Sequence, residues 1–342
     1  MSSLRMHNSQ AAKSRKLLLP YDPIPWLMEQ ESLAAVRARR LLGLAREGDE
    51  EAVRAFEARL RREQHRDGSF DGSPMKTAGV LNLLSDLRSK ESKRLIGRGV
   101  SYLASVFESQ PGYERARKAK PGSLRTPCDL CGFFGPYEDR NRPDVLAHGA
   151  REMNFYREHE PLLGPKSPVR WVRTSTLDRS GPGSCYAWGL IPLCYTVEAV
   201  CRAGHGEDER VRPAINVLLA AQRESGGWCR SLGGHPSCTV HAIRVLGSHP
   251  RLRRSRSGER AVGFIRKARE WWDNGSIRFG VIQAVAAFDL PLARAVIREE
   301  LASIVSLQRK NGTFGGPCKV ERVAAVLMAT RALGPAGHPR HG

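Results

Sequence analysis

The residues QRESGGW at positions 222–228 decide the fold, because similar residues occur twice more in the chain. The other copies are QHRDGSF at 64–70 and QRKNGTF at 308–314. In each copy a Gln ends an amphipathic stretch, and a Gly-containing turn and an aromatic residue follow. Glycine permits the left-handed backbone angles at which a chain leaves a helix, and an aromatic ring anchors a helix pair. The pattern predicts repeated helical hairpins, with each Gln hydrogen-bonded across its turn to the next unit.

The spacing of the copies sets the expected number of hairpins. Gln222 and Gln308 are 86 residues apart, and a weaker turn around Trp271 lies near their midpoint. The period is therefore about 43 residues, which is typical of a helical hairpin. Further degenerate turns at 132–135 and 171–183 raise the count to about six, and six hairpins can close a ring.

Apolar residues recur with helical period between the turns, and no stretch alternates as a β-strand would. The sequence therefore predicts an all-α protein. The expected helices cover 33–44, 80–87, 190–200, 240–246 and 320–333.

The chain is expected to form one helical domain over residues 21–334. Residues 1–20 are expected to be a basic, loosely ordered arm, and residues 335–342 a frayed tail. Pro, Gly and charged residues interrupt the repeat at 111–127 and 137–170, which predicts insertions at one rim of the ring.

The composition, with 41% hydrophobic and 26% charged residues, is typical of a globular protein. No apolar run approaches the ~20 residues of a bilayer helix, and the N-terminus lacks an apolar stretch of signal-peptide length. We therefore expect a cytoplasmic protein without an integral membrane segment. The net charge of +20 suits an anionic partner such as a membrane surface or a diphosphate ester. Nucleic-acid binding is not expected, because no recognition helix, zinc-finger spacing or aromatic–basic interleaving accompanies the charge.

The three turns resemble the QW-type repeats of squalene cyclases and of protein prenyltransferase β-subunits, and by repetition this resemblance covers most of residues 30–333. It implies an α/α toroid of about six helical hairpins around an apolar cavity that accepts an isoprenoid or an isoprenoid diphosphate. The residues GSCYAWG at 183–189 are similar to the Asp-x-Cys-Tyr run that supplies zinc ligands in the transferases. The resemblance implies that Cys185 is a zinc ligand and that Tyr186 contacts the diphosphate, with Gly183 standing where the family has Asp.

The same resemblance assigns roles to residues around this segment. The zinc His of the family falls on Cys238, with His241 one turn further on. Arg173 and Arg179 fall where the transferases carry basic diphosphate contacts, and Arg is suited to planar, bidentate contacts. The implied reaction is zinc-dependent transfer of an allylic group to a thiolate as diphosphate leaves. A partner protein subunit is also implied, because protein prenyltransferases need one.

Two sets of residues compete for a zinc ion. Cys238 and His241 are three residues apart on an expected helix, so they share a face, and zinc favours Cys and His ligands. A structural alternative is that the cysteines are small buried hydrophobic residues. The leading metal set is Cys185, Cys229, Cys238 and His241, and the competing set replaces the first two with Cys128 and Cys131.

Three functions remain open at the level of sequence: a catalytic toroid, a non-catalytic toroid that binds a lipid or protein, and a terpene cyclase-like enzyme. The last requires a buried, proton-donating carboxyl, and no Asp-x-Asp-Asp run is present. Lys76 and Arg322 are further candidates for diphosphate contacts, and Trp188, Tyr195 and Phe279 are candidates for cavity lining.

Overall fold

The structure of the chain is a computed structural model that describes residues 19–44, 46–87, 89, 92–109, 113–118, 190–228, 236–272, 276–315 and 319–334. These residues are mostly helical, and they contain isolated β-bridges but no β-strand. The expected all-α class is therefore confirmed. No helix within the described ranges combines the length and the apolar character needed to cross a membrane.

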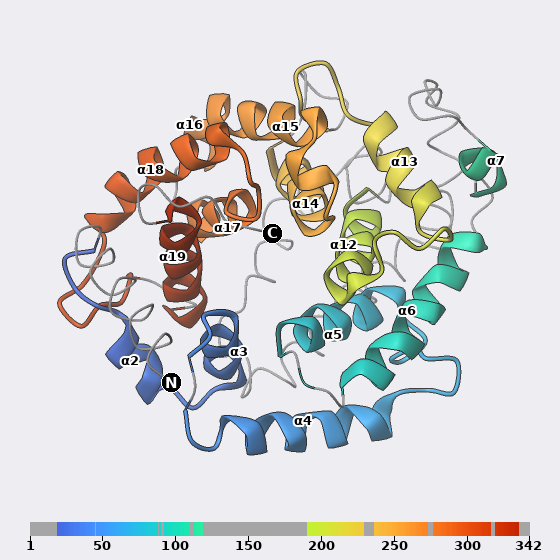
Figure 1. The fold of residues 1–342 in the computed structure, drawn as a ribbon, viewed down its shortest axis with the longest axis horizontal. Coiled ribbons are helices and arrows are strands. Elements are labelled where there is room, and N and C mark those ends of the chain that lie inside the picture. Colours follow the sequence, from blue (N-terminus) through green and yellow to red (C-terminus); the bar gives the residue numbers. More distant parts are fainter. Residues whose placement is uncertain are drawn as a thin grey trace, which may run out of the picture.

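The described helices form an inner and an outer layer (Figure 1). Each inner helix contacts the next inner helix along the chain, and the last of them contacts the first. The inner helices are α3 (Leu33–Leu41), α5 (Pro74–Leu87), α12 (Leu190–Val200), α14 (Pro236–Ser248), α17 (Ser276–Val285) and α19 (Lys319–Leu333).

The outer helices surround this inner layer (Figure 1). Most of their buried side chains join those of the inner helices in a main core, whereas those of α4 pack in a second core with residues of α3, α5 and α6. Short segments connect several of the helices: the π-helical η1 (Cys201–His205) continues α12, and the 3-10 helix η3 (Leu252–Arg254) precedes α15. The outer helices are α2 (Ile24–Glu29), α4 (Asp49–Glu63), α6 (Ser92–Glu108), α7 (Tyr113–Lys118), α13 (Arg212–Ala220), α15 (Arg256–Lys267), α16 (Arg269–Trp272) and α18 (Pro291–Val305).

Helix α7 lies in the stretch 111–127, where the sequence predicts an insertion at the rim. Tyr113 and Ala116 are buried in the main core, and α7 contacts α6 and α13. This part of the stretch therefore packs as an outer helix. The second expected insertion, at 137–170, lies outside the described residues.

The three turns that share the QW-like pattern have the same hydrogen bonds. In the second turn, Gln222 Nε2 donates to the carbonyl of Gly226 at 3.0 Å and to that of Ser257 at 2.9 Å. Ser257 belongs to α15, so the carboxamide joins its own turn to the next outer helix. The first and third turns repeat this arrangement through Gln64 with Gly68 and Leu95, and through Gln308 with Gly312 and Tyr21. The expected role of the Gln is confirmed.

The glycine of each turn lets the next outer element approach closely. Gly226 has a φ of 94°, and a Cβ atom there would lie 2.1 Å from the carbonyl oxygen of Arg260 on α15. No side chain fits in that space. The aromatic residues of the turns, Phe70, Trp228 and Phe314, are all buried, as expected of anchors.

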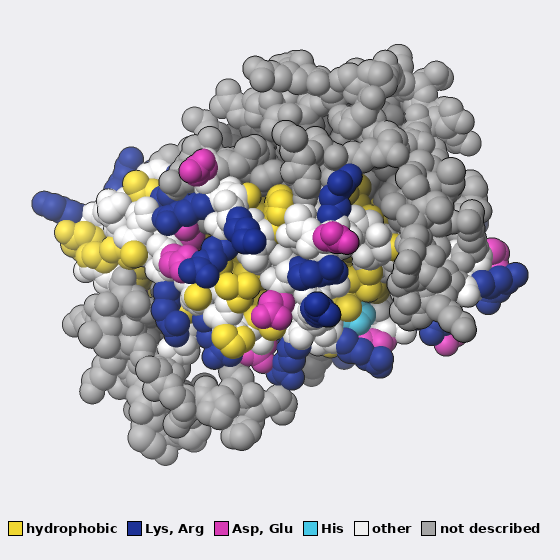
Figure 2. Space-filling view, turned by 90° about the horizontal axis from the view of Figure 1, so that it is seen from above, with side chains coloured by type: hydrophobic (Ala, Val, Ile, Leu, Met, Phe, Trp, Pro, Cys, Tyr) yellow, Lys and Arg dark blue, Asp and Glu magenta, His cyan; other side chains and the backbone are white. Residues whose placement is uncertain are grey.

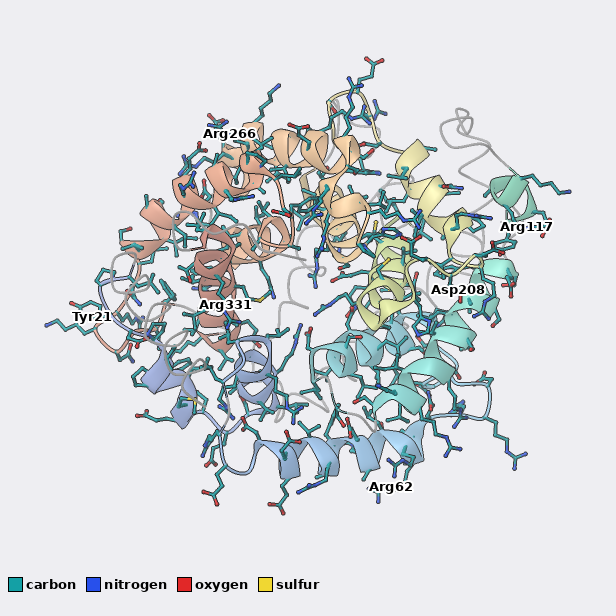
Figure 3. The ribbon with its side chains drawn as sticks, in the orientation of Figure 1. Tyr21, Arg62, Arg117, Asp208, Arg266 and Arg331 are labelled. Carbon is teal, nitrogen blue, oxygen red and sulfur yellow. The ribbon has the colours of Figure 1, made fainter. Side chains whose placement is uncertain are left out.

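The third turn connects the C-terminal part of the described chain to its N-terminal part. Gln308 donates to the carbonyl of Tyr21 at 2.7 Å and accepts from its N–H at 3.1 Å. In the inner layer, Arg331 of α19 donates to the carbonyls of Leu41 and Leu42 at 3.1 and 2.8 Å. Figure 3 labels Tyr21 and Arg331 on this side of the ring. Both layers are therefore joined here by hydrogen bonds rather than by chain continuity.

We predict that Gly226→Ala lowers the free energy of unfolding by at least about 3 kcal/mol. The alanine would be strained by the left-handed φ, and its methyl group would also clash with the carbonyl of Arg260. The matched control is Gly48→Ala. Gly48 also has a left-handed φ, of 84°, but nothing lies within 4 Å of its Cβ position. That variant should lose only about 1 kcal/mol. Urea unfolding followed by circular dichroism measures both, and equal losses would show that the close approach of α15 is unimportant.

Candidate functional site

Several of the side chains that the sequence predicts for the site lie outside the described residues. His241 is described, and Cys238 lies three residues before it on the same helix, α14, as expected. The side chain of Cys238 is not described, so neither zinc set is tested. No group of three or more His, Cys, Asp and Glu side chains suited to a metal occurs within the described ranges. The predicted residues that lie outside them are Cys128, Cys131, Arg173, Arg179, Cys185, Tyr186, Trp188 and Cys229.

Charged side chains connect four consecutive inner elements. Asp86 of α5 forms ion pairs with Arg37 of α3 and with Arg202 of η1. Glu198 of α12 lies 3.5 Å from Arg202 Nη1 and 3.1 Å from Arg244 Nε on α14. The signs alternate along this chain of contacts, so each carboxylate lies between two arginines. We call these five residues the charge network.

Burial differs between the two kinds of side chain in the network. Asp86 and Glu198 are each 4% exposed, whereas Arg37, Arg202 and Arg244 are 27%, 19% and 35% exposed. Burial opposes ionisation of Asp86, but the charges of Arg37 and Arg202 outweigh it and hold the pKa of Asp86 below its usual value. Asp86 is therefore charged, both carboxyl groups are enclosed, and the arginine side chains are partly exposed.

His241 lies next to the charge network. Burial, together with the positive charge of Arg244, lowers its pKa to about 4, against an opposing effect of Glu198. Its Nδ1 atom is buried and has no hydrogen-bond partner among the described residues. At neutral pH the imidazole is therefore uncharged, and a neutral imidazole nitrogen can bind a metal or accept a proton.

Helical spacing explains why these residues share one region. Tyr195, Glu198 and Arg202 are separated by one turn each along α12 and η1, so they lie on one face, and the same holds for His241 and Arg244 on α14. Tyr195 is partly buried against the main core.

The remaining candidates are placed away from the network. Phe279 is buried and packs on Phe314, with ring centroids 5.7 Å apart, and Arg322 lies over its ring at 4.9 Å. Phe279 is therefore a core residue. Lys76 lies 3.4 Å from Asp71 beside the first turn.

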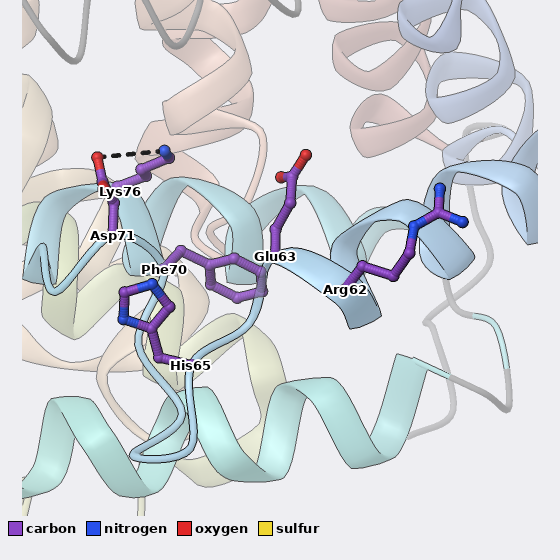
Figure 4. A pocket seen from close by; sticks show the side chains of 6 residues that line it. All are labelled: Arg62, Glu63, His65, Phe70, Asp71 and Lys76. Atoms are coloured by element: carbon purple, nitrogen blue, oxygen red, sulfur yellow. Dashed lines mark hydrogen bonds and ion pairs between the residues drawn. The ribbon is translucent and has the colours of Figure 1, made fainter.

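Lys76 and Asp71 line a separate pocket of about 310 Å³ (Figure 4). This pocket lies between the end of α4 and the start of α5, and its lining is mainly polar. The other lining residues are Arg62, Glu63, His65 and Phe70.

Sequence reasoning did not select the members of the charge network. The available signal was the recurrence of charged residues at one-turn spacing inside otherwise apolar helices, as with Glu198 and Arg202. The pairing itself is long-range: Arg37 and Arg202 lie 49 and 116 residues from Asp86 in the sequence. No local pattern predicts such partners.

Comparisons with known proteins do not assign a family. No family model matches the sequence, and no curated protein matches it. A solved structure, described as a protein from Actinoplanes, is similar over 89% of this chain and 90% of its own, with 18% identity and a TM-score of 0.44. A likeness at this level carries no argument about the fold or the function of this chain.

We predict that His241 makes stability depend on pH between about 6.5 and 4. As the pH falls through this range, the unfolded imidazole takes up a proton before the folded one does, so the folded state loses up to about 3 kcal/mol. In His241→Gln this loss should be absent. Urea unfolding at several pH values compares the two proteins, and parallel curves for both would contradict the buried, neutral state of His241.

Proposed function

We propose that this chain is an α/α toroid that binds an isoprenoid diphosphate inside its ring, with the diphosphate held by the arginines of the charge network. Six pairs of an outer and an inner helix support the toroid: α2–α3, α4–α5, α6–α12, α13–α14, α15–α17 and α18–α19. The toroid is also supported by the contacts between successive inner helices, which return from α19 to α3.

The observation that carries the proposal is the combination of buried carboxylates with partly exposed arginines. Asp86 and Glu198 orient the guanidinium groups of Arg37, Arg202 and Arg244 without neutralising them completely, since three cations share two anions. The remaining N–H groups can donate to phosphate oxygens in the planar, bidentate geometry that arginine favours. Because the cations are already held in place, little side-chain freedom is lost when an anion binds.

Partly buried apolar side chains on the inner helices support binding of a hydrocarbon chain. Tyr195 on α12 and Met328 on α19 are of this kind, and both pack against the main core. Gln283 of α17 donates to the Met328 sulfur at 3.8 Å. An isoprenoid gains about 25 cal/mol for each Å² of apolar surface that such contacts remove from water.

The properties of His241 fit a zinc ligand, because its imidazole is neutral and its buried Nδ1 atom lacks a partner among the described residues. We propose that His241 and Cys238 bind zinc together with Cys185 and Cys229. A bound zinc ion would lower the pKa of a thiol that binds to it, so that a thiolate nucleophile would be available at neutral pH. Arg173 and Arg179 remain our candidates for stabilising the leaving diphosphate, and Tyr186 remains the candidate for contacting it.

A second candidate function, a terpene cyclase-like reaction, is supported by Glu321. This residue lies in the first turn of the inner helix α19. Burial raises its pKa, and the charge of Arg37 offsets this only in part. A raised pKa is the direction that proton donation from a carboxyl to an alkene requires.

We predict that the full chain binds farnesyl diphosphate and that Arg244→Gln weakens binding at least 10-fold, because a charged hydrogen bond to the diphosphate is lost. The matched control is Arg210→Gln. Arg210 is also paired with an acid, Asp208, and it is 41% exposed, close to the 35% of Arg244. Isothermal titration calorimetry should show wild-type affinity for the control. An equal loss in both variants, or no binding by the wild type, would contradict the proposal.

We also predict about one zinc ion per chain, lost in Cys238→Ala and retained in Cys131→Ala, because the first removes a member of the leading set. Elemental mass spectrometry of the purified proteins measures this directly. Loss in both variants would favour the competing set that contains Cys128 and Cys131. Absence of zinc from all three proteins would contradict both sets and favour the non-catalytic toroid.

A further inference from the structure

The outer side of α15 and α18 is strongly basic. Figure 2 looks onto this side of the ring and shows many Lys and Arg side chains, with fewer Asp and Glu among them. The basic residues continue from η3 into α15 and reappear on α18. The exposed ones are Arg251, Arg253, Arg254, Arg256, Arg260, Arg266, Lys267 and Arg298. We call this surface the basic face.

Some of these cations are balanced by neighbouring carboxylates. Arg254 lies 2.7 Å from Asp289, and Arg266 lies 2.5 Å from Glu299. Arg251 lies 3.0 Å from Glu207. The other five are not balanced in this way: Arg253, Arg256, Arg260, Lys267 and Arg298 are exposed and form no ion pair within the described part of the chain.

Two apolar side chains lie at one end of the basic face. Tyr21 and Leu307 are 40% and 45% exposed, and they are the large hydrophobic residues exposed in the described ranges. Leu307 follows the end of α18, and the hydrogen bonds between Gln308 and the Tyr21 backbone bring Tyr21 to the same region. Figure 3 labels Tyr21 at the outer edge of the ring, on the left of the view.

We propose that the basic face is a docking surface for a bilayer that contains anionic lipids. Each Lys or Arg near such a surface increases partitioning of the protein into the bilayer about 5-fold. Apolar side chains beside a basic surface insert into the boundary between headgroups and acyl chains. The pair Tyr21 and Leu307 favours a lipid surface over nucleic acid, because a nucleic-acid backbone offers no apolar phase to insert into. This inference does not rest on the proposed ligand of the ring.

The first experiment is co-sedimentation of the full chain with vesicles. One set contains phosphatidylcholine alone, and the other contains phosphatidylcholine and phosphatidylglycerol in a ratio of about 7 to 3. We expect partitioning into the anionic vesicles at least 10-fold above that into the neutral vesicles, falling as salt rises. Equal partitioning into both sets would overturn the proposal.

The second experiment locates the surface with two matched variants. Arg253→Gln, Arg256→Gln, Lys267→Gln and Arg298→Gln combined should lower partitioning into anionic vesicles at least 100-fold. The control neutralises four exposed cations on the opposite side of the ring, by Arg54→Gln, Arg62→Gln, Lys93→Gln and Arg94→Gln. Figure 3 labels Arg62 and Arg266 on these two sides.

The control should change partitioning less than 3-fold, and circular dichroism checks that both variants are folded. Equal losses in the two variants would mean that net charge alone attracts the protein, and would overturn the assignment of a face. Leu307→Ser keeps the charge and should weaken partitioning about 3-fold or more. If a DNA duplex binds the wild type as tightly as the anionic vesicles do, at the same salt concentration, the face is a nucleic-acid surface and the proposal is wrong.

Discussion

The side-chain amide of Gln222 donates to two carbonyl oxygens that belong to different hairpins. A single residue therefore shapes its own turn and fixes the position of the next unit. Gln64 and Gln308 act in the same way. Enclosed amide groups are costly unless they are hydrogen-bonded, so a shift of the next unit would be opposed by loss of the bond between Gln222 and Ser257. Each of these turns therefore fixes its hairpin against the next outer element.

The charge network differs from the apolar surface that the sequence resemblance implies for the inner helices. The sequence resemblance implies an apolar cavity, whereas the described inner helices carry three arginines and two carboxylates in contact. Enclosing charged groups costs several kcal/mol for each ion, and good geometry with a partner offsets this. Such an arrangement contributes little to stability over an apolar core of similar volume. It holds guanidinium groups in fixed positions, and the proposed binding of an anion rests on this arrangement.

Local pattern was enough to predict much of the fold. The expected helix at 190–200 has the observed bounds, and that at 320–333 differs by one residue from α19. The helix expected at 33–44 ends earlier, at Leu41, because Gly43 adopts a left-handed φ of 61°. Helix α5 begins six residues before the apolar pattern does, since its polar first turn carries no periodicity. The candidate site could not be predicted in the same way, because its ion pairs join residues that are far apart in the sequence. Among the predicted zinc ligands and the predicted diphosphate contacts Arg173, Arg179 and Tyr186, the structure describes only the side chain of His241.

The bonds between Gln308 and Tyr21 join residues 287 positions apart. During synthesis, the partner of Tyr21 emerges only after nearly the whole ring has been made. Until then the growing chain is an open arc whose two ends expose the apolar surfaces that later meet. Contacts between distant residues also form slowly, because a long loop must close first. The ring therefore closes only when the last hairpin packs against the first. Until that hairpin leaves the ribosome, a nascent chain would need protection from other chains.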